Sequence, residues 1–276
     1  MNRIFLCIKS IPVILALAAG LPTQAADAEA LLDRALTGDH RESGNVKRDP
    51  YRHPKETLMF FGMRPDMTVL EILPGGGWYT EVLAPYLRDE GRLLVATRPM
   101  EELDHDYFRN RLKGYFAKLD ARPDVYDNVE RIHYVRGGEY LPDTTDNSVD
   151  MILVSRATHN MIRFGGLHEA YSAFYRVLKP GGILAVVQHR ATPGGAHEET
   201  AQNGYVPQNY VIGFAEGIGF ELAGRSEVNA NPKDTRDHPE GVWTLPPGFR
   251  LGDKDREKYR AIGESDRMTL KFVKPE

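Results

Sequence analysis

Hydrophobic and polar positions along this chain alternate between short, almost wholly apolar runs and longer amphipathic ones. The apolar runs predict strands, and the amphipathic stretches between them predict crossover helices. Strands of this kind are typical of a parallel sheet covered on both faces. The predicted strands are 68–73, 92–97, 131–136, 149–155 and 183–188, and the predicted helices between them are 79–87, 104–119 and 166–178.

The two ends of the chain follow a different pattern. A helix is predicted over 26–36, then a polar, extended arm over 37–54, then a helix over 54–61, because proline is favoured in the first helical turn. After the alternating part, a helix is expected over 207–217 and strands over 220–228 and 268–273. The loop 229–250 is dense in Pro, Asp, Arg and His, and its length favours a function or a lid.

The first 25 residues have the layout of a secretory signal peptide. Arg3 and Lys9 precede the apolar run 11–21, and Thr23 and Ala25 supply the small residues of a cleavage site. The run is too short to span a bilayer of about 30 Å, although an uncleaved N-terminal anchor is the alternative. We therefore expect an exported, periplasmic or secreted protein with an N-terminal arm over 26–67 and one domain over 68–276.

Composition and charge narrow the choice of partners. Of the 276 residues, 41% are hydrophobic and 27% charged, which is typical of a globular protein. The net charge of −4 predicts no nucleic-acid partner, and removal of residues 1–25 takes it to −6. Cys7 is the only cysteine, so the processed chain has no thiol metal ligand and no disulfide. No stable membrane insertion is expected after cleavage, and the oligomeric state is left open.

The segment 69–80 predicts a buried strand, a glycine loop and a helix start. A glycine loop lets the backbone approach a ligand and leaves N–H groups free at the helix start. The dinucleotide fingerprint needs a third glycine three residues after Gly77, where the chain has Thr80. A nicotinamide-dependent oxidoreductase is therefore disfavoured, with Trp78 and Tyr79 also crowding a pyrophosphate.

The chain resembles the class I S-adenosylmethionine-dependent methyltransferases. The first motif of that family, acid-x-Gly-x-Gly-x-Gly, matches 71–77, and Leu-Lys-Pro-Gly-Gly before a late strand matches 178–182. Asp150 matches the acid at the start of the fourth strand. Through 51–54 and 231–247 the chain also looks like a little-characterised group of predicted exported methyltransferases. The resemblance implies a doubly wound, mostly parallel, seven-stranded α/β fold that is Rossmann-like, with S-adenosyl-L-methionine as cofactor.

The resemblance also implies roles for single residues. Glu71 would hold the loop and the methionine ammonium, and the glycine loop would pass the methionine and ribose. Thr97 stands where the family has a ribose-binding acid, with Glu101 or Glu102 as substitutes at a different spacing, and Leu73-Pro74 replaces the first loop glycine. Glu139 lies near the adenine-contacting acid, or is a solvated loop carboxylate. The expected cofactor-binding residues are Glu71, Gly75, Gly76, Gly77, Thr97 and Glu139.

Methyl transfer from a sulfonium needs alignment first, and a general base only if the acceptor must lose a proton. Open α/β sheets place their sites beyond the carboxyl ends of the strands. After the fourth strand, Arg156 is the candidate clamp for an acidic substrate, His159 the candidate base, and Asn160 a third catalytic candidate. The alternative for His159 is a loop histidine bonded to backbone.

Four other clusters of polar residues are weaker candidates for a functional site. His189-Arg190 follows the fifth strand and can simply terminate it, and Tyr51-Arg52-His53 either closes over the cofactor or packs on the surface. His197-Glu198-Glu199 lacks a second ligand pair at helical spacing, so no metal is expected. The segment 234–238 either covers the substrate or forms a salt-bridged loop, the second being favoured.

Two functions from different classes follow. The first is a methyltransferase acting on an unidentified, small-molecule acceptor. The second is an exported, non-catalytic binding protein that keeps the fold, since the ribose acid is missing and the polar cofactor does not cross a bilayer unaided.

Overall fold

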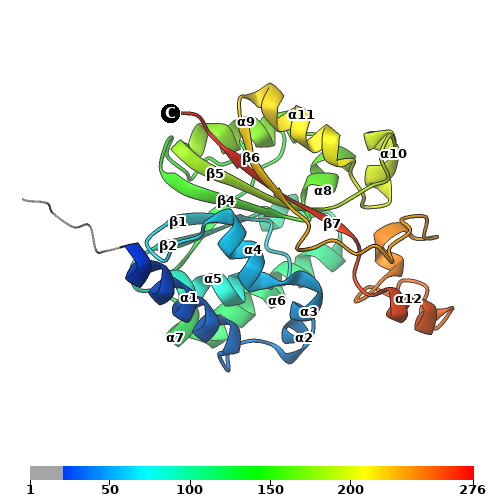
Figure 1. The fold of residues 1–276 in the computed structure, drawn as a ribbon, viewed down its shortest axis with the longest axis horizontal. Helices are drawn as coiled ribbons and strands as arrows, with labels where there is room; N and C mark the ends of the chain where they lie inside the picture. The colour runs from blue at the N-terminus through cyan, green and yellow to red at the C-terminus, as the bar shows by residue number, and fades with distance from the viewer. Residues whose placement is uncertain (1–20) are drawn as a thin grey trace, which may run out of the picture.

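The computed structural model of the protein describes residues 21–276, with side chains from residue 26 onward. Most of the predicted signal segment, 1–25, lies outside the described residues. Seven strands form one sheet in the order β3-β2-β1-β4-β5-β7-β6 (Figure 1). β7 is antiparallel to both of its neighbours, and the other pairs are parallel. The strands are β1 Thr68–Ile72, β2 Arg92–Thr97, β3 Val129–His133, β4 Val149–Ser155, β5 Leu178–His189, β6 Glu221–Ser226 and β7 Arg267–Val273.

Helices cover both faces of the sheet, as predicted. One layer holds α1 Leu21–Thr37, α4 Pro54–Phe61, α5 Thr80–Leu87, α6 Asp106–Ala121 and α7 Pro123–Tyr126, and the other holds α8 Thr158–Arg163, α9 Leu167–Val177, α10 His197–Gln202 and α11 Gln208–Ile218 (Figure 1). The remaining short elements are α2 Ser43–Val46, α3 Asp49–Arg52, η1 Met100–Glu102, η2 Gly241–Thr244 and α12 Arg256–Ile262.

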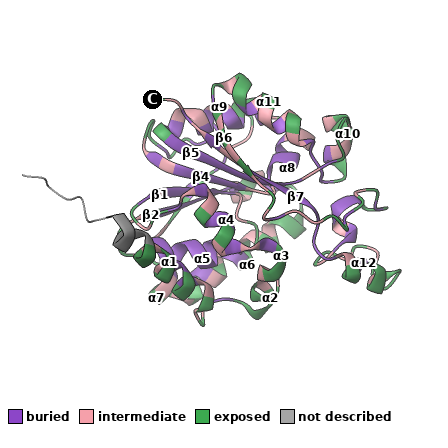
Figure 2. Cartoon of the chain, viewed as in Figure 1, coloured by how far each residue is buried: buried purple, intermediate pink, exposed green. Residues whose placement is uncertain are grey.

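Alternate residues of each central strand pack into the two helical layers. In β1, Val69 belongs to the core on the α5 side and Leu70 to the core on the α9 side, and both are fully buried. Figure 2 shows the central strands as the most completely buried part of the molecule. The doubly wound, seven-stranded α/β class expected from the sequence is confirmed.

Some local expectations were wrong. The arm 37–54 is not extended: α2 and α3 form in it, held by a hydrogen-bonded ion pair between Arg41 and Asp49. β3 lies two to three residues earlier than expected, and three of its five residues are exposed, as suits an edge strand. In α6, Tyr107 is 58% exposed, and Tyr115 and Leu119 are the buried residues.

β5 starts five residues earlier than predicted, at Leu178. Leu178 pairs with Val149, and the register then shifts before Ile183 pairs with Met151. Gly181 has a positive φ of 72° within that interval, so the Pro-Gly-Gly segment is an irregularity inside the strand.

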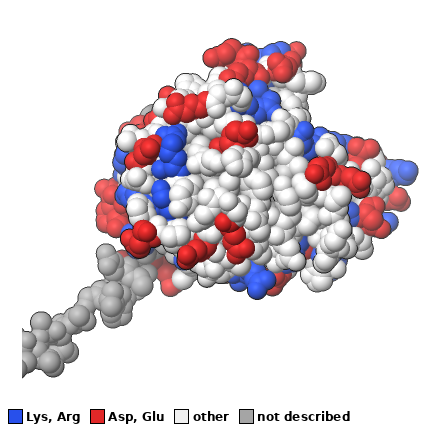
Figure 3. Space-filling model, turned by 90° about the horizontal axis from the view of Figure 1, so that it is seen from above, with Lys and Arg blue, Asp and Glu red and all other residues white. Residues whose placement is uncertain are grey.

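On the face drawn in Figure 3, acidic and basic side chains are interspersed around an uncharged central area. This face therefore has no strong electrostatic field of one sign. Among residues 21–276, none of the helices combines the length and apolar character that crossing a bilayer requires.

Candidate cofactor and acceptor site

The carboxyl ends of β1 and β4 lie side by side at the centre of the sheet. The chain leaves β1 toward β2 on one side and later reaches β4 on the other, so this is the point where the strand order reverses. Open α/β sheets bind their ligands at such a point. A hollow of about 230 Å³, counting space open to solvent, lies here. It is lined by Arg52, Glu71, Ile72, Leu73, Pro74, Trp78, Tyr79, Ser155 and Arg156.

A second hollow, of about 180 Å³, extends from the first toward β5 and β7. The two share Arg52, Tyr79, Ser155 and Arg156. The second adds Val187 near the end of β5, Asn229 after β6 and Arg267 at the start of β7. The site is therefore built from the arm, from three parallel strands and from the C-terminal strand.

The two residues that follow β1 and β4 have left-handed backbones. Leu73 has a φ of 51° and Arg156 a φ of 56°. Residues other than glycine rarely adopt this region, which costs roughly 1–2 kcal/mol per residue. Leu73 thus has the left-handed backbone that glycine adopts most readily. Both of these strained residues line the first hollow.

Glu71 is a buried carboxylate at the end of β1, 2% exposed. Burial raises its pKa to about 7, although the Thr80 hydroxyl donates to it at 2.6 Å and Arg156 and Lys118 attract the charged form. A buried carboxylate in this state is stabilised by any cation brought beside it.

The arm is fastened to the start of α5 by Trp78 and Glu81. The Trp78 indole donates to the Asn45 carbonyl at 3.0 Å, and the fully buried Glu81 accepts from Asn45 at 2.7 Å and Lys118 at 2.9 Å. The guanidinium of Arg52 lies 4.8 Å from the Trp78 ring centre. The bulky residues after the glycine loop thus anchor the arm that covers the first hollow.

A cluster of arginines surrounds the second hollow. Glu264 accepts from Arg48 at 2.6 Å and from Arg52 and Arg267 at 2.9 Å each. Burial raises the pKa of Glu264, but the three guanidiniums outweigh it and lower the pKa overall. Burial lowers the pKa of Arg52 to about 9, opposed by Glu264. Burial also lowers the pKa of Arg156 well below its usual value, and Arg52 and Arg48 lower it further.

Two buried histidines lie beyond these hollows. His159, on α8, hydrogen-bonds Gln188 at 3.4 Å, and its ring centre lies 5.8 Å from that of His189. His189 is 2.5 Å from the Ser265 hydroxyl. Burial lowers the pKa of His159 to about 4, and that of His189 falls well below its usual value for the same reason. Both rings are therefore neutral at pH 7.

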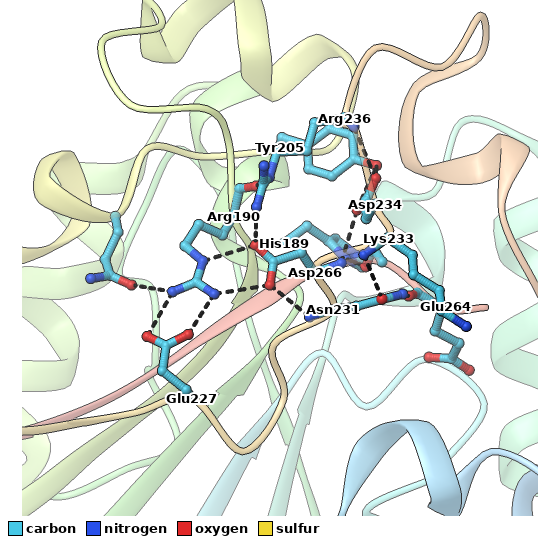
Figure 4. A network of polar contacts seen from close by, with 12 residues as sticks. His189, Arg190, Tyr205, Glu227, Asn231, Lys233, Asp234, Arg236, Glu264 and Asp266 are labelled. Carbon is cyan, nitrogen blue, oxygen red and sulfur yellow. Dashed lines mark hydrogen bonds and ion pairs between the residues drawn. The ribbon is translucent and has the colours of Figure 1, made fainter. Parts of the chain in front are cut away.

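The loop after β6 carries a closed polar network (Figure 4). Asp266 accepts from Arg190 at 2.9 Å and Arg236 at 2.6 Å, and Arg190 also binds Glu227 at 2.7 Å. Asp234 accepts from Tyr205, from His238 and from the Asp266 N–H. The acids and bases of this loop satisfy one another, which agrees with the salt-bridged interpretation of 234–238.

Comparison with known proteins supports the resemblance found in the sequence. Residues 70–186 match the family model described as "Methyltransferase domain". This segment, which is less than half of the chain, is therefore similar to methyltransferase domains. The seven-stranded, mostly parallel sheet of the whole chain, with β7 antiparallel to its neighbours, matches the fold expected for the class I methyltransferases.

Curated relatives of the methyltransferase domain are methyltransferases by name. The ubiquinone/menaquinone biosynthesis C-methyltransferase UbiE of Enterobacter sp. (strain 638) is 31% identical over 48% of this chain and 46% of its own length. The sterol 24-C-methyltransferase of Yarrowia lipolytica is 24% identical over 71% of this chain and 48% of its own length. The chain thus spans about half the length of the curated relatives it matches.

Solved structures share the fold at low identity. A SAM-dependent methyltransferase from Aquifex aeolicus superposes with a TM-score of 0.54 and 17% identity, covering 83% of this chain and 93% of that one. The [4+2]-cyclase SpnF gives 0.57 and 18%, covering 91% and 94%. At this identity the likeness establishes the fold alone. S-adenosyl-L-methionine, the cofactor that the sequence resemblance implies, is also named in the description of the Aquifex aeolicus structure.

The first hollow fits the amino-acid end of that cofactor. Glu71 offers a buried carboxylate whose charged form a nearby cation would stabilise. Arg156 offers a buried Nε without a hydrogen-bond partner among the described residues. These groups match an ammonium and a carboxylate.

Of the predicted site residues, the structure brings Glu71 and Arg156 together in the first hollow. His159 is buried behind them, and Asn160 lies beside it on α8. Burial lowers the pKa of His159 below the ordinary value for histidine, which disfavours the predicted role as a base at neutral pH. The alternative for His159, a loop histidine, was wrong, because α8 forms there.

The other cofactor-binding predictions lie outside both hollows. Gly75 and Gly76 are exposed, and Gly77 is buried against the Tyr115 ring. Thr97 is buried at the end of β2, and Glu139 is exposed and pairs with Arg176 at 3.4 Å. Their roles toward the cofactor stay predictions.

Sequence reasoning missed several residues of the site. Arg48, Glu264 and Arg267 lie in segments with no recognisable motif, and only the three-dimensional fold joins them. Tyr79 and Ser155 were visible as neighbours of the glycine loop and of Arg156. Arg52 stood in the arm motif 51–54, and the structure favours its closing position over the surface one.

Proposed function

We propose that this protein is an S-adenosyl-L-methionine-dependent methyltransferase acting on a small-molecule acceptor. The observation that carries the proposal is the placement of Glu71 and Arg156 in one hollow at the reversal point of the sheet. The domain match over 70–186 and the methyltransferase names of the curated relatives support the reaction class.

The proposed mechanism rests on positioning. The cofactor supplies a methyl group that its sulfonium already activates. Glu71 holds the cofactor's ammonium, and Arg156 holds its carboxylate. Trp78 and the arm it anchors keep water away from the first hollow. Alignment of this kind supplies roughly 7–11 kcal/mol of barrier reduction.

His159 has a limited part in this scheme. It is neutral at pH 7 and can accept a hydrogen bond from an acceptor group. With a pKa of about 4, it is a poor general base at neutral pH. The proposal therefore favours an acceptor that needs little help in losing a proton.

Calorimetric titration of residues 26–276 with S-adenosylhomocysteine tests the cofactor site. We expect micromolar binding that Glu71→Gln weakens by at least about tenfold, because the charge facing the ammonium is lost. Glu90→Gln, at an exposed position just before β2, is the matched control and leaves the affinity unchanged. No binding to a folded sample would refute the proposal.

A second assay follows the reaction itself. Labelled S-adenosylmethionine is incubated with the protein and fractionated small-molecule extracts, and label is followed into products. Label should move with wild type and stop with Glu71→Gln. Cofactor binding without label transfer to any fraction would favour the non-catalytic binding protein.

We also propose that the protein is exported. Arg3, Lys9, the apolar run 11–21 and the small residues Thr23 and Ala25 support this. Mass spectrometry of the protein purified from whole cells and from the secreted or periplasmic fraction tests it. Export predicts a mature N-terminus at Ala26 in the exported fraction. An intact residue 1 in a cytosolic fraction would contradict it.

A further inference from the structure

The arginine cluster around the second hollow carries more positive charge than the protein itself neutralises. Arg48, Arg52 and Arg267 share the single carboxylate of Glu264. Arg156 lines the same hollow and has no ion pair within 4 Å to a carboxylate in the described residues. Arg52 and Arg267 are 3% and 2% exposed, so solvent does not relieve the imbalance.

Unused donors are found on the same side chains. Among the described residues, Nη2 of Arg52, Nε of Arg156 and Nε of Arg267 are buried and have no hydrogen-bond partner. A buried donor on a charged group is costly to leave unpaired. A guanidinium also keeps its proton in proteins, so neutralisation by proton loss is not open to it.

The neighbouring carboxylates already bind other side chains. Asp266, the residue before Arg267, accepts from Arg190 and Arg236. Asp234 is bonded to Tyr205 and His238. Neither carboxylate forms an ion pair with the four arginines of the cluster, so these two acids do not supply the missing negative charge.

The proposed cofactor accounts for only part of that charge. Its carboxylate would neutralise one guanidinium, and its ammonium would be matched by Glu71. Two arginines of the four would still be without a carboxylate. The donors of Arg52 and Arg267 border the second hollow, on the side toward β5 and β7, where an acceptor would lie.

We propose that the second hollow is an anion subsite that holds a phosphate or carboxylate group of the methyl acceptor. Arg267, Arg52 and Arg156 bind the group, and Arg156 also bridges this subsite and the cofactor's end of the site. The planar fork of a guanidinium suits oxygen pairs of either group. The assignment of the bound group to the methyl acceptor rests on the proposed function. Anion binding in the second hollow does not depend on it.

Inorganic phosphate is the probe. Residues 26–276 are titrated with phosphate by calorimetry at constant ionic strength, with and without saturating S-adenosylhomocysteine. Phosphate should bind in both conditions, and Arg156→Met should weaken it by about tenfold or more, because a charge-assisted contact is lost. Arg250→Met is the control: this arginine is half-exposed on Trp243, away from both hollows, and its loss leaves phosphate binding unchanged.

Stability of the free protein separates a binding role from a structural one. Arg156 has no partner to lose, so Arg156→Met should keep or raise the melting temperature without phosphate. Arg267→Met breaks the contact with Glu264 and should lower it. Phosphate should raise the melting temperature of wild type and of Arg250→Met, and not that of Arg156→Met.

Each outcome is decisive. No phosphate binding, or binding that Arg156→Met leaves intact, overturns the subsite. Competition between phosphate and S-adenosylhomocysteine assigns the arginines to the cofactor's carboxylate and overturns the acceptor subsite. Phosphate binding with no S-adenosylhomocysteine binding supports the anion subsite and refutes the proposed function alone.

Discussion

Arg52 on the N-terminal arm donates from Nε to Glu264, just before the last strand, at 2.9 Å across 212 positions of the chain. Both side chains are buried, and the same carboxylate also holds Arg48 and Arg267. One acid thus joins the two ends of the domain over its candidate site.

Replacing Glu264 by Gln should destabilise the fold strongly. The change leaves three buried guanidiniums without a counter-charge, and breaking a buried pair in this way costs about 3–5 kcal/mol. Urea unfolding followed by circular dichroism measures the loss. Glu257→Gln, in an exposed ion pair with Arg260, is the control and should change the free energy of unfolding by at most about 1 kcal/mol. Equal effects of the two changes would contradict the role given to Glu264.

Glu71→Gln should stabilise the free protein, and more so at high pH. The folded pKa of Glu71 is raised from 4.5 to about 7. A raised pKa means that the folded state holds the proton more tightly, so wild type loses stability from this group as pH rises through that window. At pH 8 the amide variant should gain up to about 3 kcal/mol relative to its gain at pH 4.5. Unfolding curves at the two pH values test this, and a pH-independent difference would refute it.

His159→Gln should remove part of the acid sensitivity of the fold. Burial lowers the pKa of His159 from 6.5 to about 4, so the folded state resists protonation. Wild type therefore loses up to about 3 kcal/mol as pH falls through that window. Thermal melts between pH 7 and pH 4.5 should fall less steeply for the variant. His168→Gln, at an exposed position of α9, should melt like wild type at every pH.

Gly77→Ala should be far more damaging than Gly76→Ala. Gly77 has a φ of 82°, and a Cβ there would lie 2.7 Å from the buried Tyr115 ring. The strain and the clash together should cost roughly 1–3 kcal/mol. A Cβ on Gly76 would meet its nearest atom only at 3.8 Å, on the Arg111 side chain. Melting temperatures of the two variants make the comparison, and equal losses would contradict it.

The fold was readable from the sequence because its signals are local. The apolar runs at β1, β2 and β4 were placed to within one residue, since parallel strands buried on both faces carry an unmistakable composition. β3 was misplaced because it is an edge strand whose side chains are mostly exposed. The arm helices were missed because contacts with α5 stabilise them, and segments of four residues have no propensity strong enough to show this.

The site was readable only in part. Glu71 and Arg156 follow from the rule that ligands bind beyond the carboxyl ends of strands. The arginine cluster does not, because its members come from segments more than 200 positions apart and no motif links them. The low pKa of His159 also needed the structure, since burial behind Gln188 causes it.

The join between Arg52 and Glu264 has a consequence for how the protein matures during synthesis. In a growing chain Arg48 and Arg52 emerge long before Glu264, so until residue 264 leaves the ribosome these two arginines lack the carboxylate that they share. The binding pocket should therefore be absent from any product shortened at the C-terminus before that position, even one that keeps the whole matched segment 70–186. Ligand binding would then report that synthesis has passed residue 264.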